Sequence, residues 1–124
     1  MSHARAPRRI QAFWQSVDSD RLYLAVQTIG EIRRGVGNIR RRGDADQARR
    51  LEGWLDQVVT GYADRILDFD LDCAQVWGAL MSPHSQHPID KQIAAIALIH
   101  DLTVVTRNVD DFTGTGVRLS NPFS

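Results

Sequence analysis

Residues 88–106 have the sequence PIDKQIAAIALIHDLTVVT, and this stretch decides the fold class. Residues 89–100 are apolar nearly all round once the first turn is passed, which predicts a helix that is buried on most sides. Residues 103–106 are rich in valine and threonine and predict a short strand directly after it. A helix that leads at once into a strand indicates an α/β fold.

The same alternation extends outward from this stretch in both directions. A further helix is predicted at residues 7–17, and three more are predicted from their caps. The first begins after Thr28 and ends at the arginine run before Gly43, the second begins after Asp44 and ends at Gly61, and the third begins after Asp70. Further short strands are predicted at residues 22–26, 66–69 and 117–119. Strands that alternate with helices favour a central, mostly parallel sheet with helices on both faces. In such sheets the functional residues lie beyond the carboxyl ends of the strands.

Length and composition limit the class of protein. The 124 residues suit one domain spanning residues 1–124, and 43% hydrophobic with 24% charged residues is a globular composition. No apolar run approaches the roughly 18 residues that cross a bilayer, and no apolar segment follows the N-terminal arginines as in a secretory signal. The single cysteine, Cys73, excludes an internal disulfide and is expected in the core. We expect a cytoplasmic protein without a membrane partner.

The formal net charge of zero conceals an asymmetry along the chain. Residues 1–50 carry 11 arginines against five acids, whereas residues 51–124 carry four bases against ten acids. Arginine suits phosphate contacts, and charge asymmetry of this kind hints at a nucleic-acid partner. A genome that favours arginine codons explains the ratio of arginine to lysine equally well, but not the segregation into halves.

Three groups of polar residues lie where predicted strands end or predicted helices begin. Glu31 follows the strand at 22–26, Asp90 opens the apolar helix, and residues 106–112 follow the strand at 103–106. Each group has a purely structural alternative. Glu31 can complete a capping box with Thr28, Asp90 can offset the helix dipole, and residues 106–112 can be an ordinary polar turn.

The three groups together indicate a metal site. Because they share one edge of the predicted sheet, their carboxylate and amide oxygens are expected to converge, and these are ligands that suit Mg²⁺ or Mn²⁺. A zinc site at His84 and His87 is not expected, because no cysteine or third ligand lies near them in the sequence; both histidines are predicted to be solvent-exposed.

Four motifs resemble those of the PIN-domain ribonucleases, and of the VapC and FitB toxins in particular. YLAVQTIGEIRRG (residues 23–35) is similar to the second acidic motif and PIDKQIAAIA (residues 88–97) to the third. VTRNVDDF (residues 105–112) resembles the fourth, and GTGVRLSNP (residues 114–122) the usual ending. The resemblance runs in order from about residue 10 to the C-terminus.

The resemblance implies a three-layer α/β/α PIN fold and a Mg²⁺- or Mn²⁺-dependent endoribonuclease with a VapB-like antitoxin partner, commonly as a homodimer. It implies catalytic roles for Glu31, Asp90 and Asp111, with Asn108 as a further metal ligand and Asp111 acting through a water. Contacts with RNA are expected from Arg33, Arg34, Arg40, Arg41, Arg42, Thr106 and Arg107. The run at residues 40–42 is explained equally well as a solvated helix end that the helix dipole favours.

The chain departs from the family at its N-terminus. The family begins with a buried strand that ends in Asp-Thr-Asn, and nothing in residues 1–11 matches it. We therefore expect a PIN fold without its first strand and without that aspartate, marginal in stability unless it dimerises or binds a partner. Two alternatives to an active nuclease follow: a catalytically inactive PIN-like module that binds antitoxin or RNA, and a generic α/β domain whose acids are helix caps.

Overall fold

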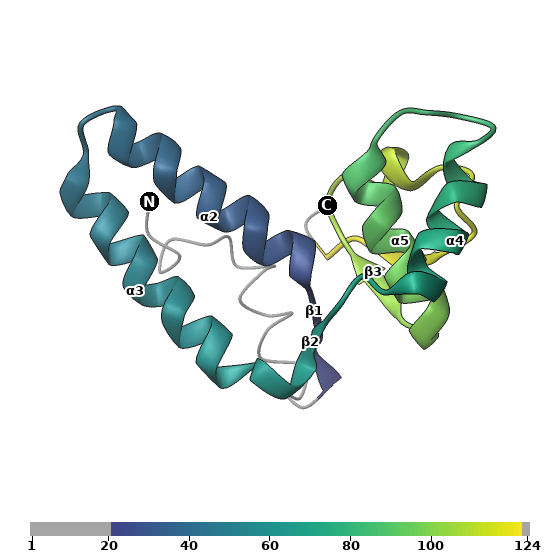
Figure 1. Ribbon diagram of the computed structural model, residues 1–124, viewed down its shortest axis with the longest axis horizontal. Helices are drawn as coiled ribbons and strands as arrows, with labels where there is room; N and C mark the ends of the chain where they lie inside the picture. Colours follow the sequence, from purple (N-terminus) through teal and green to yellow (C-terminus); the bar gives the residue numbers. More distant parts are fainter. Residues whose placement is uncertain (1–20, 123–124) are drawn as a thin grey trace. The chain divides into compact units, whose positions relative to one another are not determined.

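A computed structural model of the chain describes residues 21–122. The chain divides into two compact units, one formed by Leu22–Leu67 and the other beginning at Asp68 (Figure 1). Each unit contains a helical pair and one pair of short parallel strands. The helix predicted at residues 7–17 and the prediction that a first strand is missing both concern residues outside the described ones.

The first unit is a hairpin of two long helices that begins and ends in a short strand. Its elements are β1 (Leu24–Ala25), α2 (Val26–Arg41), α3 (Ala45–Gly61), the single 3-10 turn η3 (Ala63–Arg65) and β2 (Ile66–Leu67). β1 and β2 run parallel, with Leu24 opposite Ile66. Figure 1 shows α2 and α3 lying side by side, and their hairpin returns the chain to pair the two strands.

Buried aliphatic side chains hold α2 and α3 together. Val36 of α2 packs with Ala48 and Leu51 of α3, and Ile39 covers this cluster. Leu55 of α3 is fully buried. Burial of one such large aliphatic side chain contributes about 1.5–3 kcal/mol, so this apolar seam is what makes the helical hairpin stable.

The turn between the two helices follows local signals in the sequence. Gly43 has φ +95°, a left-handed conformation that glycine adopts without a steric penalty. The side chain of Asp44 accepts a hydrogen bond from the backbone N–H of Gln47 at 3.1 Å and caps α3. The predicted Asp44 cap and the predicted end of α3 at Gly61 are both confirmed.

Two ion pairs also link α2 to α3. The guanidinium of Arg40 donates to both carboxylate oxygens of Glu52 at 2.9 and 2.6 Å, and Arg33 donates to Asp56 at 3.2 Å. The hydrogen bond from Arg40 is the main reason why the pKa of Glu52 lies below its usual range.

The second unit packs two helices against a pair of parallel strands. Its elements are α4 (Leu71–Met81), α5 (Pro88–His100), β3 (Thr103–Val105), the 3-10 turn η4 (Val109–Phe112) and β4 (Arg118–Ser120). β3 and β4 pair in parallel register, with Val104 opposite Leu119. The predicted Asp70 cap of α4 is confirmed, since the Asp70 side chain accepts from the backbone N–H of Cys73 at 3.0 Å. Cys73 is buried, as predicted.

The core of this unit forms where α5 meets η4. Ala94 and Ala97 of α5 are buried together with Phe112 and Val117. Asp101 has φ +56° and turns the chain out of α5, and the N–H of Leu102 then donates to the carbonyl of Ala97 at 2.8 Å. This turn places β3 directly against the helix that precedes it.

Three expectations need correction. The strand predicted at residues 22–26 is only Leu24–Ala25, because Val26 already begins α2. Thr28 does not cap α2: the N-cap is Ala25, without a side-chain hydrogen bond. The preference for threonine at an N-cap is worth only about 1 kcal/mol, so it does not decide where this helix starts. The apolar helix is also less covered than expected, with Ile89, Leu98 and Ile99 each more than a third exposed.

The described residues form two two-stranded sheets, and both pairings are parallel, as predicted for an α/β fold. None of the helices within residues 21–122 is long and apolar enough to cross a membrane.

The Arg40–Glu52 pair makes the stability of the helical hairpin depend on pH. Because the pKa of Glu52 is lowered in the folded chain, its contribution is present above the unfolded pKa of about 4.3 and is lost as the pH falls through the folded pKa. We expect Glu52→Gln to lower the melting temperature at pH 7 and to match the unsubstituted chain near pH 3.

The control for this prediction is Asp56→Asn, which removes the more exposed, single-bonded partner of Arg33 and should have a smaller effect. Thermal melts at pH 7, 5 and 3 check it. A Glu52→Gln deficit of the same size at all three pH values contradicts the assigned role of the ion pair.

Candidate metal centre

Phe112 brings two of the predicted acidic residues together. Asp90 is the third residue of α5, and Asp111 lies in η4, after β3. Phe112 packs on Ala94, which is one helical turn beyond Asp90, and on Ala97. Since Asp111 precedes Phe112 in the chain, this apolar contact carries its carboxylate to the start of α5.

His87 completes a cluster with the two aspartates. One ligand atom from each of His87, Asp90 and Asp111 lies within 4.8 Å of the others. His87 Nε2 is 3.6 Å from Asp111 Oδ1, and His87 Nδ1 is 4.0 Å from Asp90 Oδ2. The aspartate side chains are about one-third exposed and the imidazole is about half exposed, so the cluster is accessible from solvent.

The surroundings of Asp90 destabilise the charged form of its carboxylate. Partial burial raises its pKa above the ordinary value, and the negative charge of Asp111 raises it further, while His87 acts in the opposite direction. Removing a carboxylate from water and placing it beside a second one both disfavour its charged form. A divalent cation bound between these oxygens would offset both effects.

The segment that carries His87 is held from two sides. Lys91 is almost fully buried, and its ammonium donates to the carbonyls of His84 and Gln86 at 2.7 and 2.6 Å. On the other side, Trp77 Nε1 of α4 donates to the carbonyl of Pro88 at 3.0 Å. His87 is the N-cap residue of α5 and adopts the left-handed conformation, with φ 55° and ψ 55°. The start of α5 therefore has a backbone fixed by hydrogen bonds rather than a free loop.

Residues 106–111 form a closed turn around the end of β3. The backbone N–H of Asn108 donates to Thr106 Oγ1 at 3.0 Å, and the N–H of Asp111 donates to the carbonyl of Asn108 at 3.1 Å. The turn that residue composition suggests is thus present, and it is the same turn that presents Asp111. Asn108 and Arg107 are exposed on it, and Thr106 is half-buried.

Glu31 lies in α2, in the other unit. Because α2 begins at Val26, Glu31 is in the second turn, and the capping-box explanation through Thr28 is wrong. Its side chain is exposed. That Glu31 joins Asp90 and Asp111 at a metal stays a prediction.

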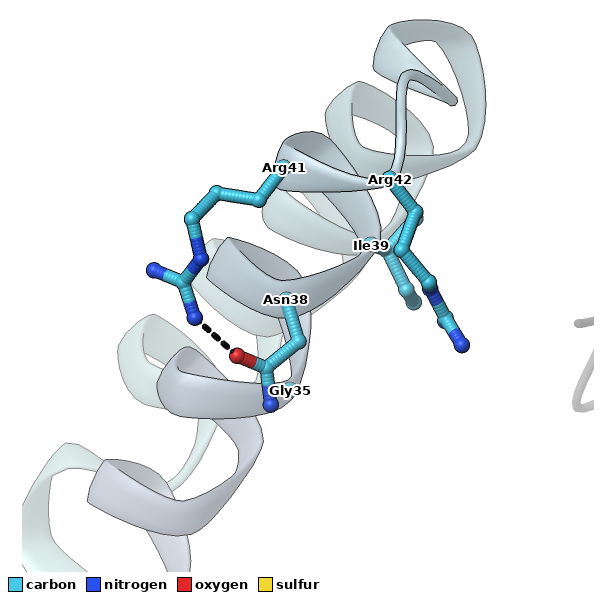
Figure 2. A pocket seen from close by; sticks show the side chains of 5 residues that line it. All are labelled: Gly35, Asn38, Ile39, Arg41 and Arg42. Atoms are coloured by element: carbon cyan, nitrogen blue, oxygen red, sulfur yellow. Dashed lines mark hydrogen bonds between the residues drawn. The ribbon is translucent and has the colours of Figure 1, made fainter.

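The five arginines of α2 and its C-cap that are predicted to contact RNA differ in their partners. Arg33 and Arg40 are paired with carboxylates of α3, whereas Arg34 and Arg42 form no ion pair within residues 21–122. Arg41 donates to the side chain of Asn38. Figure 2 shows Arg41 and Arg42 extending from opposite sides of the end of α2. They line a shallow hollow there with Gly35, Asn38 and Ile39.

His87 was missed by the sequence argument. It is exposed, as predicted, but the expectation that no further ligand lies near it is wrong, because Asp90 and Asp111 are both within 4.0 Å. A signal was present in the sequence: His87 precedes Asp90 by three residues at a helix start, a spacing that places both on one side of the first turn. The buried hydrogen bonds of Lys91 had no comparable signal.

Comparison with known proteins identifies the relatives of this chain. Residues 3–116 match the PIN domain family. VapC ribonuclease Y4jK of Sinorhizobium fredii is 30% identical over 128 residues, covering 97% of this chain and 88% of the relative. Toxin FitB of Neisseria gonorrhoeae is 31% identical over 121 residues, covering 93% and 85%.

Solved structures agree with the sequence relatives. The crystal structure of FitAcB from Neisseria gonorrhoeae has a TM-score of 0.82 to this chain at 30% identity, covering 94% of this chain and 86% of that one. Both the resemblance derived from the four motifs and the α/β PIN fold class are confirmed by these matches.

Replacement of Lys91 tests how the start of α5 is held. We expect Lys91→Met to lower the free energy of unfolding by about 2 kcal/mol, because two hydrogen bonds from a charged donor are lost while the apolar stem is kept. Urea denaturation measures the change. His84→Ala is the matched control, since it keeps the carbonyl that Lys91 contacts; equal stability of Lys91→Met and this control contradicts the assignment.

Replacement of Asp90 distinguishes two explanations for this residue: a carboxylate whose charged form is destabilised in the cluster, and a carboxylate that offsets the helix dipole. Because its pKa is raised in the folded chain, stability is lost as the pH rises through that pKa. Asp90→Asn should therefore raise the melting temperature in EDTA at pH 7, and the gain should vanish near pH 3.

An aspartate that offsets the helix dipole has the opposite effect: its neutralisation lowers the free energy of unfolding by about 0.3–1 kcal/mol. Asp72→Asn, in the first turn of α4, is the control that should show this loss. Destabilisation of both variants at pH 7 would favour the dipole explanation for Asp90.

Proposed function

The chain belongs to the PIN-domain family, and from this premise we propose that it is a Mg²⁺- or Mn²⁺-dependent endoribonuclease, the toxin of a type II toxin–antitoxin pair. The observation that carries the proposal is the convergence of Asp90 and Asp111, from two elements of the second unit, at positions that match the third and fourth acidic motifs. The relatives named VapC ribonuclease and toxin FitB support the same activity.

The residues fit a divalent cation. Two carboxylates lie close together at an accessible place, and the pKa of Asp90 is raised, first by partial burial and then by the charge of Asp111, so a nearby positive charge would stabilise its ionised form. Carboxylate oxygens are the donors that Mg²⁺ and Mn²⁺ prefer. Asp90 and Asp111 would hold the cation, with Glu31 and Asn108 completing the set. A cation bound there supplies the means to acidify a water and to neutralise charge on a phosphodiester.

The contributions of the chain itself are positioning and charge. Asp90 is fixed by its place in the first turn of α5, and Asp111 is fixed by the turn that Thr106 and Phe112 anchor. Neither carboxylate needs to move far to share one ion. These contacts support the proposal, because metal-assisted hydrolysis requires ligands whose positions are held by the fold.

The arginines of α2 are the proposed RNA contacts. Arg34 and Arg42 are free of ion pairs within residues 21–122, so they are the first candidates for phosphate; Arg33 and Arg40 would have to exchange Asp56 and Glu52 for it. Thr106 and Arg107 lie on the turn that presents Asp111 and would contact the same strand of RNA. Binding of this kind is salt-dependent and carries little sequence information.

The proposed partner is a VapB-like antitoxin that covers the site. This inference rests on the relatives, which include a protein named toxin FitB and a solved FitAcB structure. A homodimer in the cytoplasm is proposed from the family resemblance of the sequence motifs alone.

A nuclease assay tests the proposal. Purified chain with Mn²⁺ should cleave single-stranded RNA, and EDTA should stop cleavage. Asp90→Ala and Asp111→Ala should each lower the rate roughly 100-fold or more, as expected when a group that stabilises the transition state is lost. Asp110→Ala is the matched control, because Asp110 is an exposed neighbour of Asp111 outside the cluster, and it should keep the activity.

Cleavage that persists in Asp90→Ala, or that ignores EDTA, overturns the metal mechanism. RNA binding without cleavage by the folded chain, at any Mn²⁺ concentration, identifies a binding module instead of an enzyme.

A further inference from the structure

The two aspartates of the proposed metal site share their cluster with an imidazole. Both ring nitrogens of His87 face carboxylates: Nε2 lies 3.6 Å from Asp111 Oδ1, and Nδ1 lies 4.0 Å from Asp90 Oδ2. The cluster thus offers a cation one nitrogen donor, from His87, and two oxygen donors, from Asp90 and Asp111.

We infer that His87 is a protein ligand of the same divalent cation, and that its nitrogen shifts the preference of the site from Mg²⁺ towards transition-metal ions such as Mn²⁺. The inference rests on the proposed function, because it takes Asp90 and Asp111 as ligands of that cation.

The spacing of the three side chains fits one ion. Metal–ligand bonds of about 2.0–2.2 Å place neighbouring ligand atoms about 3 Å apart and opposite ones about 4.2 Å apart. Only one ring nitrogen of His87 can bind a given ion, so the spacing that applies is that of one ligand atom from each residue, and these three atoms lie within 4.8 Å of one another. Small rotations of exposed side chains are enough to close the difference.

The backbone at His87 is placed by the fold. Lys91 binds the carbonyls of His84 and Gln86, Trp77 binds the carbonyl of Pro88, and the residue between them is the N-cap of α5. His84, the other histidine of this segment, is exposed and lies outside the cluster. The chain therefore fixes one of its two loop histidines at the site and leaves the other away from it.

The kind of donor determines the choice of ion. Mg²⁺ favours oxygen ligands and keeps several waters, so an imidazole adds little to its binding. Ions of the first transition series accept imidazole more readily than Mg²⁺ does, with affinities that are lowest for Mn²⁺ and rise towards Cu²⁺. A set of two carboxylates and one imidazole therefore binds Mn²⁺ more tightly than two carboxylates alone.

An alternative role for His87 predicts the opposite effect. If the imidazole serves only as a positive partner of the two aspartates, it competes with the cation for the same oxygens. Its removal would then strengthen metal binding or leave it unchanged, whereas loss of a ligand weakens it. The sign of the change separates the two roles.

The experiment measures Mn²⁺ binding to the full chain at pH 8 by electron paramagnetic resonance of free Mn²⁺, with Mg²⁺ affinity obtained by competition. We expect His87→Ala to raise the Kd for Mn²⁺ about tenfold or more and the Kd for Mg²⁺ less than about threefold. His84→Ala is the matched control and should bind both ions as the unsubstituted chain does. Circular dichroism checks the fold, and His87→Asn provides a second variant whose residue type tolerates the left-handed backbone.

Pulsed electron paramagnetic resonance gives a direct signature. Bound Mn²⁺ should show coupling to a ¹⁴N nucleus in the unsubstituted chain and in His84→Ala, and this coupling should disappear in both His87 variants. Absence of the coupling, or Mn²⁺ binding that is unchanged or tighter in His87→Ala while Asp90→Asn loses it, overturns the role of His87 and leaves the proposed function standing. Failure of Asp90→Asn to weaken Mn²⁺ binding removes the metal site itself, and the proposed function with it.

Discussion

The contact of Phe112 with the alanine face of α5 is the interaction on which the second unit depends. Ala94 and Ala97 present only methyl groups, so the aromatic ring of Phe112 reaches the helix and is almost fully buried. A larger side chain at either alanine would push η4 outward, since close-packed interiors do not absorb added volume without strain. Asp111 would then move away from Asp90. The alanine-rich composition of α5 is therefore as necessary to the site as the carboxylates are.

The apolar contact of Phe112 with α5 keeps the negatively charged side chains of Asp90 and Asp111 close to each other. The free energy gained by burying Phe112 offsets the repulsion between Asp90 and Asp111 and the partial desolvation that raises the pKa of Asp90. Functional sites commonly hold such locally unfavourable arrangements, which the surrounding fold maintains. The His87–Asp90–Asp111 cluster is thus held by apolar side chains and backbone hydrogen bonds, while its own charges are left incompletely balanced.

The parts of the fold that could be predicted are those set by neighbouring residues. The caps Asp44 and Asp70 and the extent of α5 are local in this sense, and all were predictable. The proximity of Asp90 and Asp111 could also be predicted, because residues that follow strands or begin helices gather at one edge of a parallel sheet. The start of α2 at Val26, with Ala25 as its N-cap, was not predictable, since the residue type that makes the better cap, Thr28, stands three positions after Ala25.

Other features depend on contacts that no periodicity encodes. The position of His87 follows from its left-handed backbone and from the reach of Lys91 to two carbonyl oxygens. An exposed histidine between a polar loop and a proline has the same local sequence whether or not carboxylates face it. Asp111 faces His87 only because η4 packs against α5, and η4 lies more than 20 residues further along the chain.

Lys91 is the only lysine in the sequence, and its ammonium group is buried against two carbonyl oxygens. Reagents and enzymes that act on lysine side chains, such as acylating labels or a lysine-specific protease, therefore have a single internal target, and the folded chain shields it. Access to that one amine reports whether the start of α5 is intact. A structural hydrogen bond thereby becomes a chemical indicator of the state of the segment that carries His87.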